Sequence, residues 1–412
     1  MQSVDLRCKH YVYFLALLVA FLLCEDIQSA YAELLGDKIK PFFSAREVYD
    51  SNIFRIKDKE QLKNLIGDDQ LSDFITILTL GLGLNYQISR QELGLLLKKD
   101  LLRYSYYTSE DSEQDEVNGG ISLRVLDRIS ANLKGSYTKL PEARENYWTK
   151  QKNERMTTAG GITVGYDLPS GFSIQAGFGQ EKVDFSLSVF DYRERTNKSY
   201  SGTLSYSPST ESRFYAVYQR NALDYDLLQP IGGTLVNNDS TGDTIKVGVD
   251  KKFSPKTSLS LYTGYLWRKY KEFSARDFHG VIGKAVVNYI ITEKLTLSII
   301  GERELYEAVF LDQIYSVDES LRLGIGYKPT AKIETFIDGR TAEISYKGDA
   351  NIIAIAFPER KDTLNEFRTG IVWSPIRRLS IDLLYRYTTR NSNFDIYDFK
   401  AHGIEFGTTY KF

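Results

Sequence analysis

Short segments in which apolar and polar residues alternate recur along most of the chain, and this period of two restricts the fold more than any other feature. One such segment places Leu78, Leu80, Leu82, Leu84 and Tyr86 on one side and Thr79, Gly81, Gly83, Asn85 and Gln87 on the other. A period of two with one apolar and one polar face is typical of a β-strand that buries a single face.

Proline and small polar residues separate these segments at tight reversals. Examples are Leu168-Pro169-Ser170-Gly171, Ser254-Pro255-Lys256 and Pro375-Ile376-Arg377, and longer polar loops alternate with them. Such residues suit turns and would interrupt a central strand. Eight short turns and about nine long loops predict one antiparallel sheet of about 18 strands, with 16 as the alternative, and both ends on one side.

A soluble sandwich or propeller would also bury one alternating face, so the prediction of a membrane protein needs separate evidence. Tyrosine is abundant at 29 residues, and aromatic residues gather at strand ends, as at Tyr86, Tyr166, Tyr206, Tyr265, Trp267, Tyr289, Tyr327, Trp373, Tyr385 and Tyr410. Short turns, long loops and aromatic girdles characterise outer-membrane barrels, and closure satisfies every backbone group in lipid. We therefore predict an all-β transmembrane antiparallel β-barrel with both termini in the periplasm.

The first 32 residues read as a secretory signal peptide. Arg7 and Lys9 precede an apolar run, Val12 to Leu23, that is too short to span a bilayer as a helix. Ala30-Tyr31-Ala32 is a small-x-small cleavage site, which makes residues 33–412 a single mature barrel domain.

Both cysteines, Cys8 and Cys24, lie inside this signal. A lipid-modified cysteine wants a small residue before it, and Leu23 is large, which argues against lipidation at Cys24. The mature chain therefore has no thiol, and we expect no disulfide and no thiolate chemistry in it.

The C-terminal segment alternates up to its end. Ile404, Phe406, Thr408, Tyr410 and Phe412 share one face. A terminal strand of this kind resembles the recognition signal of the bacterial barrel-assembly machinery, so Tyr410 and Phe412 are the predicted assembly signal. We place the protein in the outer membrane of a Gram-negative bacterium, in contact with lipid and lipopolysaccharide.

Parity assigns a mixed set of charges to the inner face in the C-terminal third. The pore-lining candidates are Lys284, Glu302, Glu304, Glu334, Asp338, Arg340, Arg368, Asp382, Arg386 and Glu405. Interleaved signs on neighbouring strands predict cross-strand pairs. These either only keep the lumen polar or form a track for a hydroxylated or weakly charged solute, since Arg forks suit sugar hydroxyls and uronate groups.

An enzymatic barrel is the less favoured alternative. The two histidines beyond the signal, His279 and His402, lie about six predicted strands apart, with no Ser or Asp partner at a fixed spacing. We find no triad, metal-ligand spacing or phosphate loop, and expect neither catalysis nor a cofactor or metal. A net charge of −2 gives no reason to expect nucleic acid as a partner.

The largest loops are polar: Lys57 to Ser72, Ser105 to Glu116, Pro141 to Met156, Asn221 to Asp243 and Thr341 to Thr363. They form either a solvated rim or segments that fold inward and narrow the pore. Two strands, Lys40 to Asp50 and Glu92 to Tyr106, alternate poorly, and the consecutive Lys98 and Lys99 suggest a bulge or a misplaced boundary.

The first strand ends in Tyr49-Asp50-Ser51-Asn52-Ile53-Phe54-Arg55. This motif resembles the putative β-barrel porin 2 family, and within it the EpsL-type proteins encoded with exopolysaccharide biosynthesis genes. The resemblance implies an exit for exopolysaccharide that works with an inner-membrane polymerase and a periplasmic export partner. In the motif, we expect Asp50 and Asn52 to make side-chain turns, Phe54 to lie in the interfacial girdle and Arg55 to pair with a loop carboxylate.

Three functions remain open. The first is a passive conduit for exopolysaccharide export, the second a general or sugar-preferring diffusion porin, and the third a loop-plugged structural or adhesive barrel. A diffusion porin often separates acids on an inward loop from a basic wall, whereas the signs here are interleaved, which favours the conduit.

Overall fold

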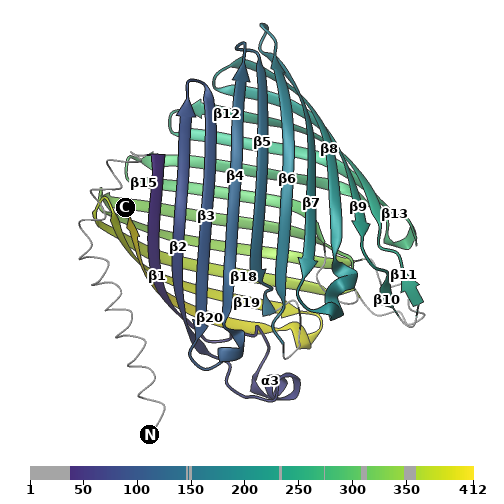
Figure 1. The fold of residues 1–412 in the computed structure, drawn as a ribbon, viewed down its shortest axis with the longest axis vertical. Coiled ribbons are helices and arrows are strands. Elements are labelled where there is room, and N and C mark those ends of the chain that lie inside the picture. Colours follow the sequence, from purple (N-terminus) through teal and green to yellow (C-terminus); the bar gives the residue numbers. More distant parts are fainter. Residues whose placement is uncertain are drawn as a thin grey trace.

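The computed structural model describes residues 38–144, 147, 151–231, 234–272, 274–307, 313–347 and 359–412. The predicted signal peptide, residues 1–32, lies outside them. The chain forms one closed antiparallel sheet of 18 strands (Figure 1), which confirms the predicted fold and strand number. Each strand pairs with its neighbours along the chain, and β1 closes the barrel between β2 and β20.

The strands of the first half are β1 (Ile39–Asp50), β2 (Asp73–Ile88), β3 (Gln91–Tyr104), β4 (Ser112–Val125), β5 (Ile129–Pro141), β6 (Glu154–Asp167), β7 (Phe172–Phe185), β8 (Arg195–Ser209) and β9 (Ser212–Tyr225). Those of the second half are β12 (Ser240–Ser254), β13 (Thr257–Tyr270), β14 (Phe278–Thr292), β15 (Leu295–Glu307), β16 (Tyr315–Thr330), β17 (Ile333–Lys347), β18 (Lys361–Ile376), β19 (Leu379–Ser392) and β20 (Phe399–Lys411).

The connections carry a few small elements. They are α3 (Lys59–Leu65), the hairpin β10 (Gln229–Ile231) and β11 (Thr234–Val236), and the 3-10 turns η2 (Thr108–Glu110), η4 (Ser188–Arg193), η5 (Ser274–Arg276) and η6 (Asp395–Tyr397). Among the described residues, no helix is both long and apolar enough to cross a membrane.

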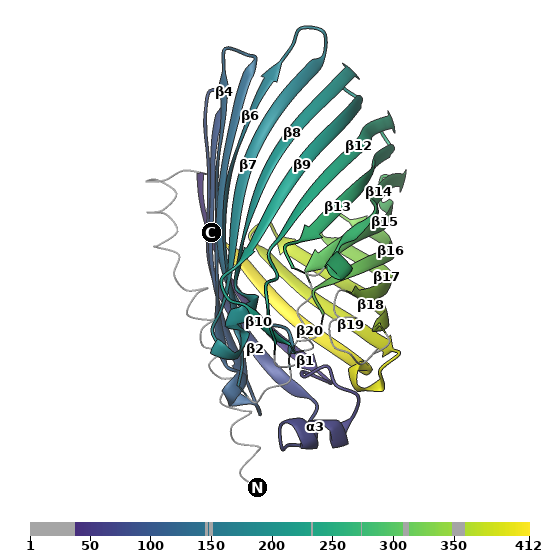
Figure 2. The same cartoon turned by 90° about the vertical axis from the view of Figure 1, so that its right-hand side faces the viewer.

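The tight reversals and the longer connections lie at opposite ends of the barrel (Figure 2). Four turn positions need a left-handed backbone: Ser89, Leu126, Asp127 and Gly171 all have a φ between 51° and 81°. Short turns face the periplasm in outer-membrane barrels, so the end that carries α3 is the extracellular one.

The closing strands meet near the tight turns. Phe43 of β1 lies opposite Tyr410 of β20, and the Phe412 amide donates to the Pro41 carbonyl at 3.0 Å. The beginning of β1 and the end of β20 therefore lie together at the periplasmic end.

The barrel strands have 12 to 16 residues and extend into segments that were expected to be loops, such as Asn221 to Asp243. The reason lies on their outer faces. On β7, the exposed Phe172, Ile174 and Phe178 are followed toward the extracellular end by Gln180 and Lys182 on the same face. The wall thus continues beyond its apolar band, and the residues expected in loops extend the strands instead.

This extension also accounts for the poor alternation in β3. Lys99 lies on the outer face, where its ammonium pairs with Glu113 at 2.7 Å and Asp115 at 3.2 Å on the neighbouring β4. Lys98 lies on the inner face, with Asp100 at 2.8 Å. The pairing of β3 with β2 and β4 runs without a register shift, so the suggested bulge is wrong.

The extracellular connections have small cores of their own. Phe54, Ile56 and Leu62 of the β1–β2 connection pack with Tyr107 of the β3–β4 connection. The carboxylate of Asp58 caps α3 by accepting from the Gln61 amide at 2.9 Å. These buried apolar side chains join loops that are far apart in the sequence.

Candidate functional site

The inner face is the candidate site, and parity locates it on every strand. Along the strands, inner-face residues alternate with large apolar side chains that are exposed on the lipid face, for example Ile162, Phe178, Tyr218, Leu323 and Leu383. The intervening residues point into the barrel.

Part of one wall of the lumen, from β3 to β9, carries mainly small neutral groups, whereas charged residues such as Lys98 and Glu116 lie on the inner face closer to the extracellular end. A cavity of 780 Å³ lies against it and is lined by Asn118, Ser136, Asn197, Ser199, Gln219 and Asn221, together with several glycines. Lys134 and Glu181 are the only charged residues in its lining. This wall offers amide and hydroxyl donors and acceptors with little fixed charge.

The opposite wall, from β14 through β20 to β1, carries ion pairs across neighbouring strands. The ammonium of Lys284 lies 2.8 Å from Glu302, and the guanidinium of Arg368 lies 2.7 Å from Asp338. Arg340 lies 3.2 Å from Glu366.

The network continues across the closing strands. Arg46 of β1 pairs with Glu405 and lies 3.5 Å from Asp382, while Arg386 lies 3.6 Å from Asp50. Opposite charges on neighbouring strands therefore form a lattice of separate clusters along this wall.

All ten pore-lining candidates have inner-face parity, and the structure brings eight of them into this lattice. Glu304 accepts a hydrogen bond from the Tyr262 hydroxyl. Glu334 stands apart at the periplasmic end, where it is half exposed and pairs with Lys328 at 3.0 Å. Whether the ten select a solute stays a prediction.

Sequence reasoning missed Arg46, Arg322 and Glu366. Arg322 bridges Asp338 and Glu366, each at 3.9 Å. The alternation of the sequence could have predicted the inner-face position of Arg322, because its neighbours Leu321 and Leu323 lie on the lipid face. Arg46 was hidden, because Glu47 follows it on the outer face and bonds Thr76 of β2 at 2.6 Å.

The family-like motif works as a joint at the extracellular end of β1. The Asn52 amide donates to Asp50 at 2.9 Å, and the Asn52 side chain donates to the Lys400 carbonyl at 3.1 Å. Arg55 holds both carboxylate oxygens of Asp50, at 2.8 and 2.6 Å. The partner of Arg55 is thus a carboxylate of the same motif, and the joint ties β1 to β20.

The expected place of Phe54 is wrong. Its ring is 3% exposed and meets the Tyr107 ring edge-on at 4.8 Å inside the loop core. Tyr49 instead faces lipid, with its ring 5.1 Å from that of Phe74. Phe54 lies beyond the strand, where the β1–β2 connection turns over the barrel end, so parity did not apply to it.

Buried Arg–carboxylate pairs tie the extracellular connections to one another. Arg144 pairs with Glu110, and Arg193 pairs with Glu142, in each case between two different connections. Arg360 and Arg390 pair with Asp362 at the extracellular ends of β18 and β19. A buried charge is costly without a partner, so these pairs fix the segments that contribute to them. The described loop residues thus form a tied layer at the rim.

A nearby cation also stabilises the ionised form of one loop carboxyl, that of Asp239. Burial alone would raise the pKa of Asp239, but the Lys271 ammonium, 2.7 Å away, and the Tyr225 amide outweigh it, so the pKa lies below its usual value. Asp239 therefore holds the β9–β12 connection as a carboxylate at neutral pH.

The barrel wall is split between β14 and β15 in its extracellular half. Their pairing ends at Gly283 and Arg303, whereas β14 stays paired with β13 up to Phe278 and β15 stays paired with β16 up to Glu307. The Arg303 guanidinium donates to the Val281 carbonyl at 2.9 Å, in place of a ladder bond.

Beyond this split, the ends of β15 and β16 lie inside the wall. Glu307 pairs with Arg268 of β13 and lies 3.4 Å from the Tyr225 hydroxyl of β9. The Tyr315 ring lies 5.7 Å from that of Phe278. Arg268, Tyr225 and Phe278 all have inner-face parity, so this overlap, which we name the inward fold (Leu305–Glu307 and Ile314–Val317), narrows the lumen. It belongs to none of the five loops singled out by length.

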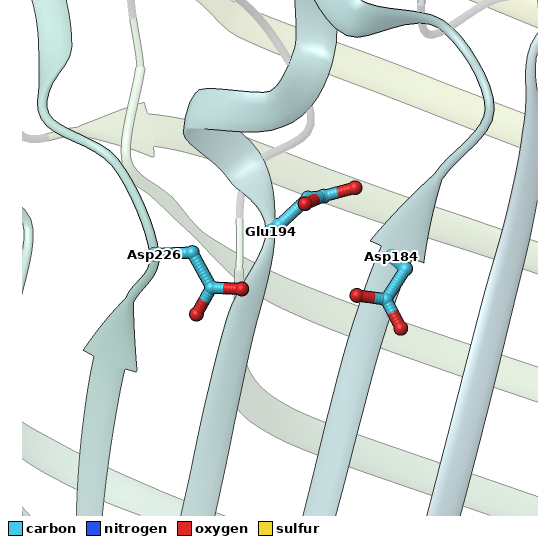
Figure 3. Close-up of side chains that lie close together, drawn as sticks. All are labelled: Asp184, Glu194 and Asp226. Carbon is cyan, nitrogen blue, oxygen red and sulfur yellow. The ribbon is translucent and has the colours of Figure 1, made fainter.

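Other titratable groups lie away from the lumen. Asp184, Glu194 and Asp226 come close together at the extracellular ends of β7 to β9 (Figure 3), with carboxylate oxygens within 4.8 Å of one another. Lys182, 2.7 Å from Asp184, supplies part of the balancing charge. His402 is exposed on the outer face, where its Nδ1 lies 2.9 Å from the Tyr385 hydroxyl, and His279 lies opposite Trp267.

Solved structures with a similar fold include an outer membrane protein of Pseudomonas aeruginosa. The chain resembles the outer membrane protein OpdK of Pseudomonas aeruginosa with a TM-score of 0.50 and 11% identity, over 91% of this chain and 99% of that one. OccK9 (OpdG) of the same organism gives a TM-score of 0.50 and 11% identity, over 91% and 98%. No curated protein matches the sequence.

A family description covers nearly the whole chain. Residues 38–412 match the family described as "Putative beta-barrel porin 2". Together with the closed 18-stranded barrel, this makes the protein a channel of the outer membrane rather than an enzyme. The chain belongs to the Putative beta-barrel porin 2 family.

Proposed function

We propose that this porin is a passive conduit for exopolysaccharide leaving the cell through the outer membrane. The observation that carries the proposal is the division of the lumen into two walls. A wall of amides, hydroxyls and glycines faces a wall of interleaved ion pairs. Hydroxylated solutes exchange hydrogen bonds with water readily for bonds to both kinds of group.

The interleaving of signs supports a conduit over a general diffusion pore. The inner-face cations Lys284 and Arg340 each have a carboxylate within 3.2 Å on a neighbouring strand, so positive and negative groups are interleaved along that wall. A long neutral or partly charged polymer can slide along such a surface without meeting a region that repels it.

A sugar-preferring diffusion porin is the second candidate, and the inward fold favours it. Segments that overlap the lumen limit the size of what passes, as constrictions do in diffusion channels. The tied loops at the rim would support the third candidate, a structural barrel, only if the pore were closed.

The proposed conduit would need partners that bring polymer to it. We propose that a periplasmic export component delivers polymer from an inner-membrane polymerase to the end formed by the tight turns. We also propose that the barrel-assembly machinery reads the strand that ends in Tyr410 and Phe412, and that lipopolysaccharide surrounds the charged outer faces of β3 to β6.

Single-channel conductance tests the proposal. The protein is purified from outer membranes after expression of the full chain, and current is recorded in planar bilayers with and without acidic and neutral oligosaccharides. Block by oligosaccharides at low concentration supports a polysaccharide conduit. Steady current that sugars do not alter supports the diffusion porin. A folded, heat-modifiable barrel without current would overturn the open channel.

A further inference from the structure

Two arginines lie directly opposite each other on the charged wall. Arg368 of β18 and Arg386 of β19 are paired in register and both face the lumen. Like charges in this position destabilise a sheet unless something compensates them. Asp338 accepts two hydrogen bonds from Arg368, at 3.0 and 2.7 Å, whereas Asp50 lies 3.6 Å from Arg386.

The arginine side chains of this region are more exposed than the carboxylates with which they pair. The side chains of Arg368, Arg386 and Arg46 are 44%, 46% and 32% exposed. Their partners Asp338, Asp50 and Asp382 are 14%, 6% and 10% exposed. Asp50 also pairs with Arg55, and Asp338 also lies 3.9 Å from Arg322, so a solute in the lumen meets guanidinium groups first, with shared carboxylates beneath them.

The same residues surround a hollow in the wall. A cavity of 420 Å³ is lined by Arg46, Arg368, Arg386, Asp382 and Glu405, and its apolar part by Val48, Phe336, Val372 and Leu384. It therefore combines planar cationic donors with an apolar surface.

We infer that this hollow is a subsite for a sugar unit that carries an anionic group, which makes the exported polymer an acidic polysaccharide. The planar guanidinium groups match the two oxygens of a carboxylate and also bind sulfate or phosphate oxygens. The apolar residues suit the C–H face of a sugar ring. The inference rests on the proposed function, since it requires that a saccharide enters the lumen.

The test compares chemically matched sugars. Block of single-channel current is measured with oligogalacturonate and with the same oligomer after reduction of its carboxyl groups. We expect oligogalacturonate to block at a concentration at least about ten-fold lower, since hydrogen bonds to charged groups contribute more than neutral ones. A sulfated neutral oligomer then separates carboxylate preference from general anion binding.

Substitutions locate the effect. We expect R368Q/R386Q to remove the preference for oligogalacturonate. We expect R368K/R386K, which keeps the positive charge but lacks the planar guanidinium group, to retain part of that preference. The control is Arg213→Gln, which removes a half-exposed inner-face guanidinium near the periplasmic end, 3.9 Å from Asp250. The heat-modifiable band on a gel reports folding, and the Lys pair covers the case in which the Gln pair does not fold.

The outcomes separate this inference from the proposed function. Equal block by the acidic and reduced oligomers would overturn the subsite and leave the conduit in place. A preference that persists in a folded R368Q/R386Q barrel would also overturn it. Absence of block by every oligosaccharide would overturn the conduit itself.

Discussion

The side chain of Arg303 bonds the backbone carbonyl of Val281 at the point where β14 and β15 part. It also pairs with Glu319 on the outer face. One guanidinium therefore satisfies a carbonyl that the ladder leaves out and anchors the strand beyond the split.

Replacing Arg303 with Ala should lengthen the split. The Val281 carbonyl loses its donor, at a cost on the order of 1 kcal/mol for one hydrogen bond. We expect faster amide hydrogen exchange in Gly283–Val286, measured by mass spectrometry, with the rest of the barrel unchanged. Arg220→Ala is the matched control, because Arg220 is also an outer-face arginine near a carboxylate, but its strand is fully laddered. Equal effects of the two substitutions would contradict the role of Arg303.

Replacing Glu307 with Gln should release the inward fold. Glu307 balances Arg268, which is buried against the inner face, and removal of one partner of a buried pair costs roughly 3–5 kcal/mol. We expect a higher single-channel conductance and noisier current in the variant. Glu113→Gln, which removes a carboxylate on the outer face of β4, is the control. Conductance that stays at the wild-type value would show that the inward fold does not limit the pore.

Removing inner-face carboxylates should change ion selectivity. Glu302 and Glu304 lie two residues apart on β15 and face the lumen beside Lys284 and Tyr262. In E302Q/E304Q, Lys284 loses its counter-charge, so the reversal potential in a potassium chloride gradient should shift toward anion selectivity. Glu113→Gln changes a carboxylate on the outer face and should leave the reversal potential where it is.

Replacing Gly171 with Ala should weaken the barrel at one periplasmic turn. Gly171 has a φ of 81°, and a Cβ there would lie 2.6 Å from the Ser207 carbonyl oxygen. The left-handed backbone alone costs about 1–2 kcal/mol for an L-residue, and we expect a lower midpoint of denaturant unfolding. Gly202→Ala is the control, because a Cβ at Gly202 would meet nothing within 4 Å. A midpoint equal in the two variants would contradict the strain.

The sequence predicts the barrel because lipid and lumen impose opposite demands on alternate residues. That rule holds through every tight turn, so strand number, direction and the ten inner-face candidates follow from parity. It fails where a strand leaves the apolar band. Lys99 and Glu47 carry charge on the outer face, which makes the ends of β3 and β1 look irregular and conceals Arg46.

The inward fold could not be predicted from local pattern. Its ion pair joins Glu307 to Arg268, and its hydroxyl contact joins Glu307 to Tyr225, 82 residues away. The alternation of β15 does not mark the residue at which the strand leaves β14. Apolar side chains such as Leu305 and Val317 suit a lipid-facing position as well as a position against the inside of the barrel wall. Only the packing of the closed barrel decides between these two environments.

The carboxylates recessed behind Arg368 and Arg386 compete with any anion that enters the hollow. An anionic group in the lumen can bind a guanidinium fully only if it displaces Asp338 from Arg368 or Asp50 from Arg386. In the proposed conduit this competition would reduce the net free energy of binding, so that an anionic unit is recognised and then released. Release of each bound unit is what passive movement of the proposed acidic polymer along the pore would require.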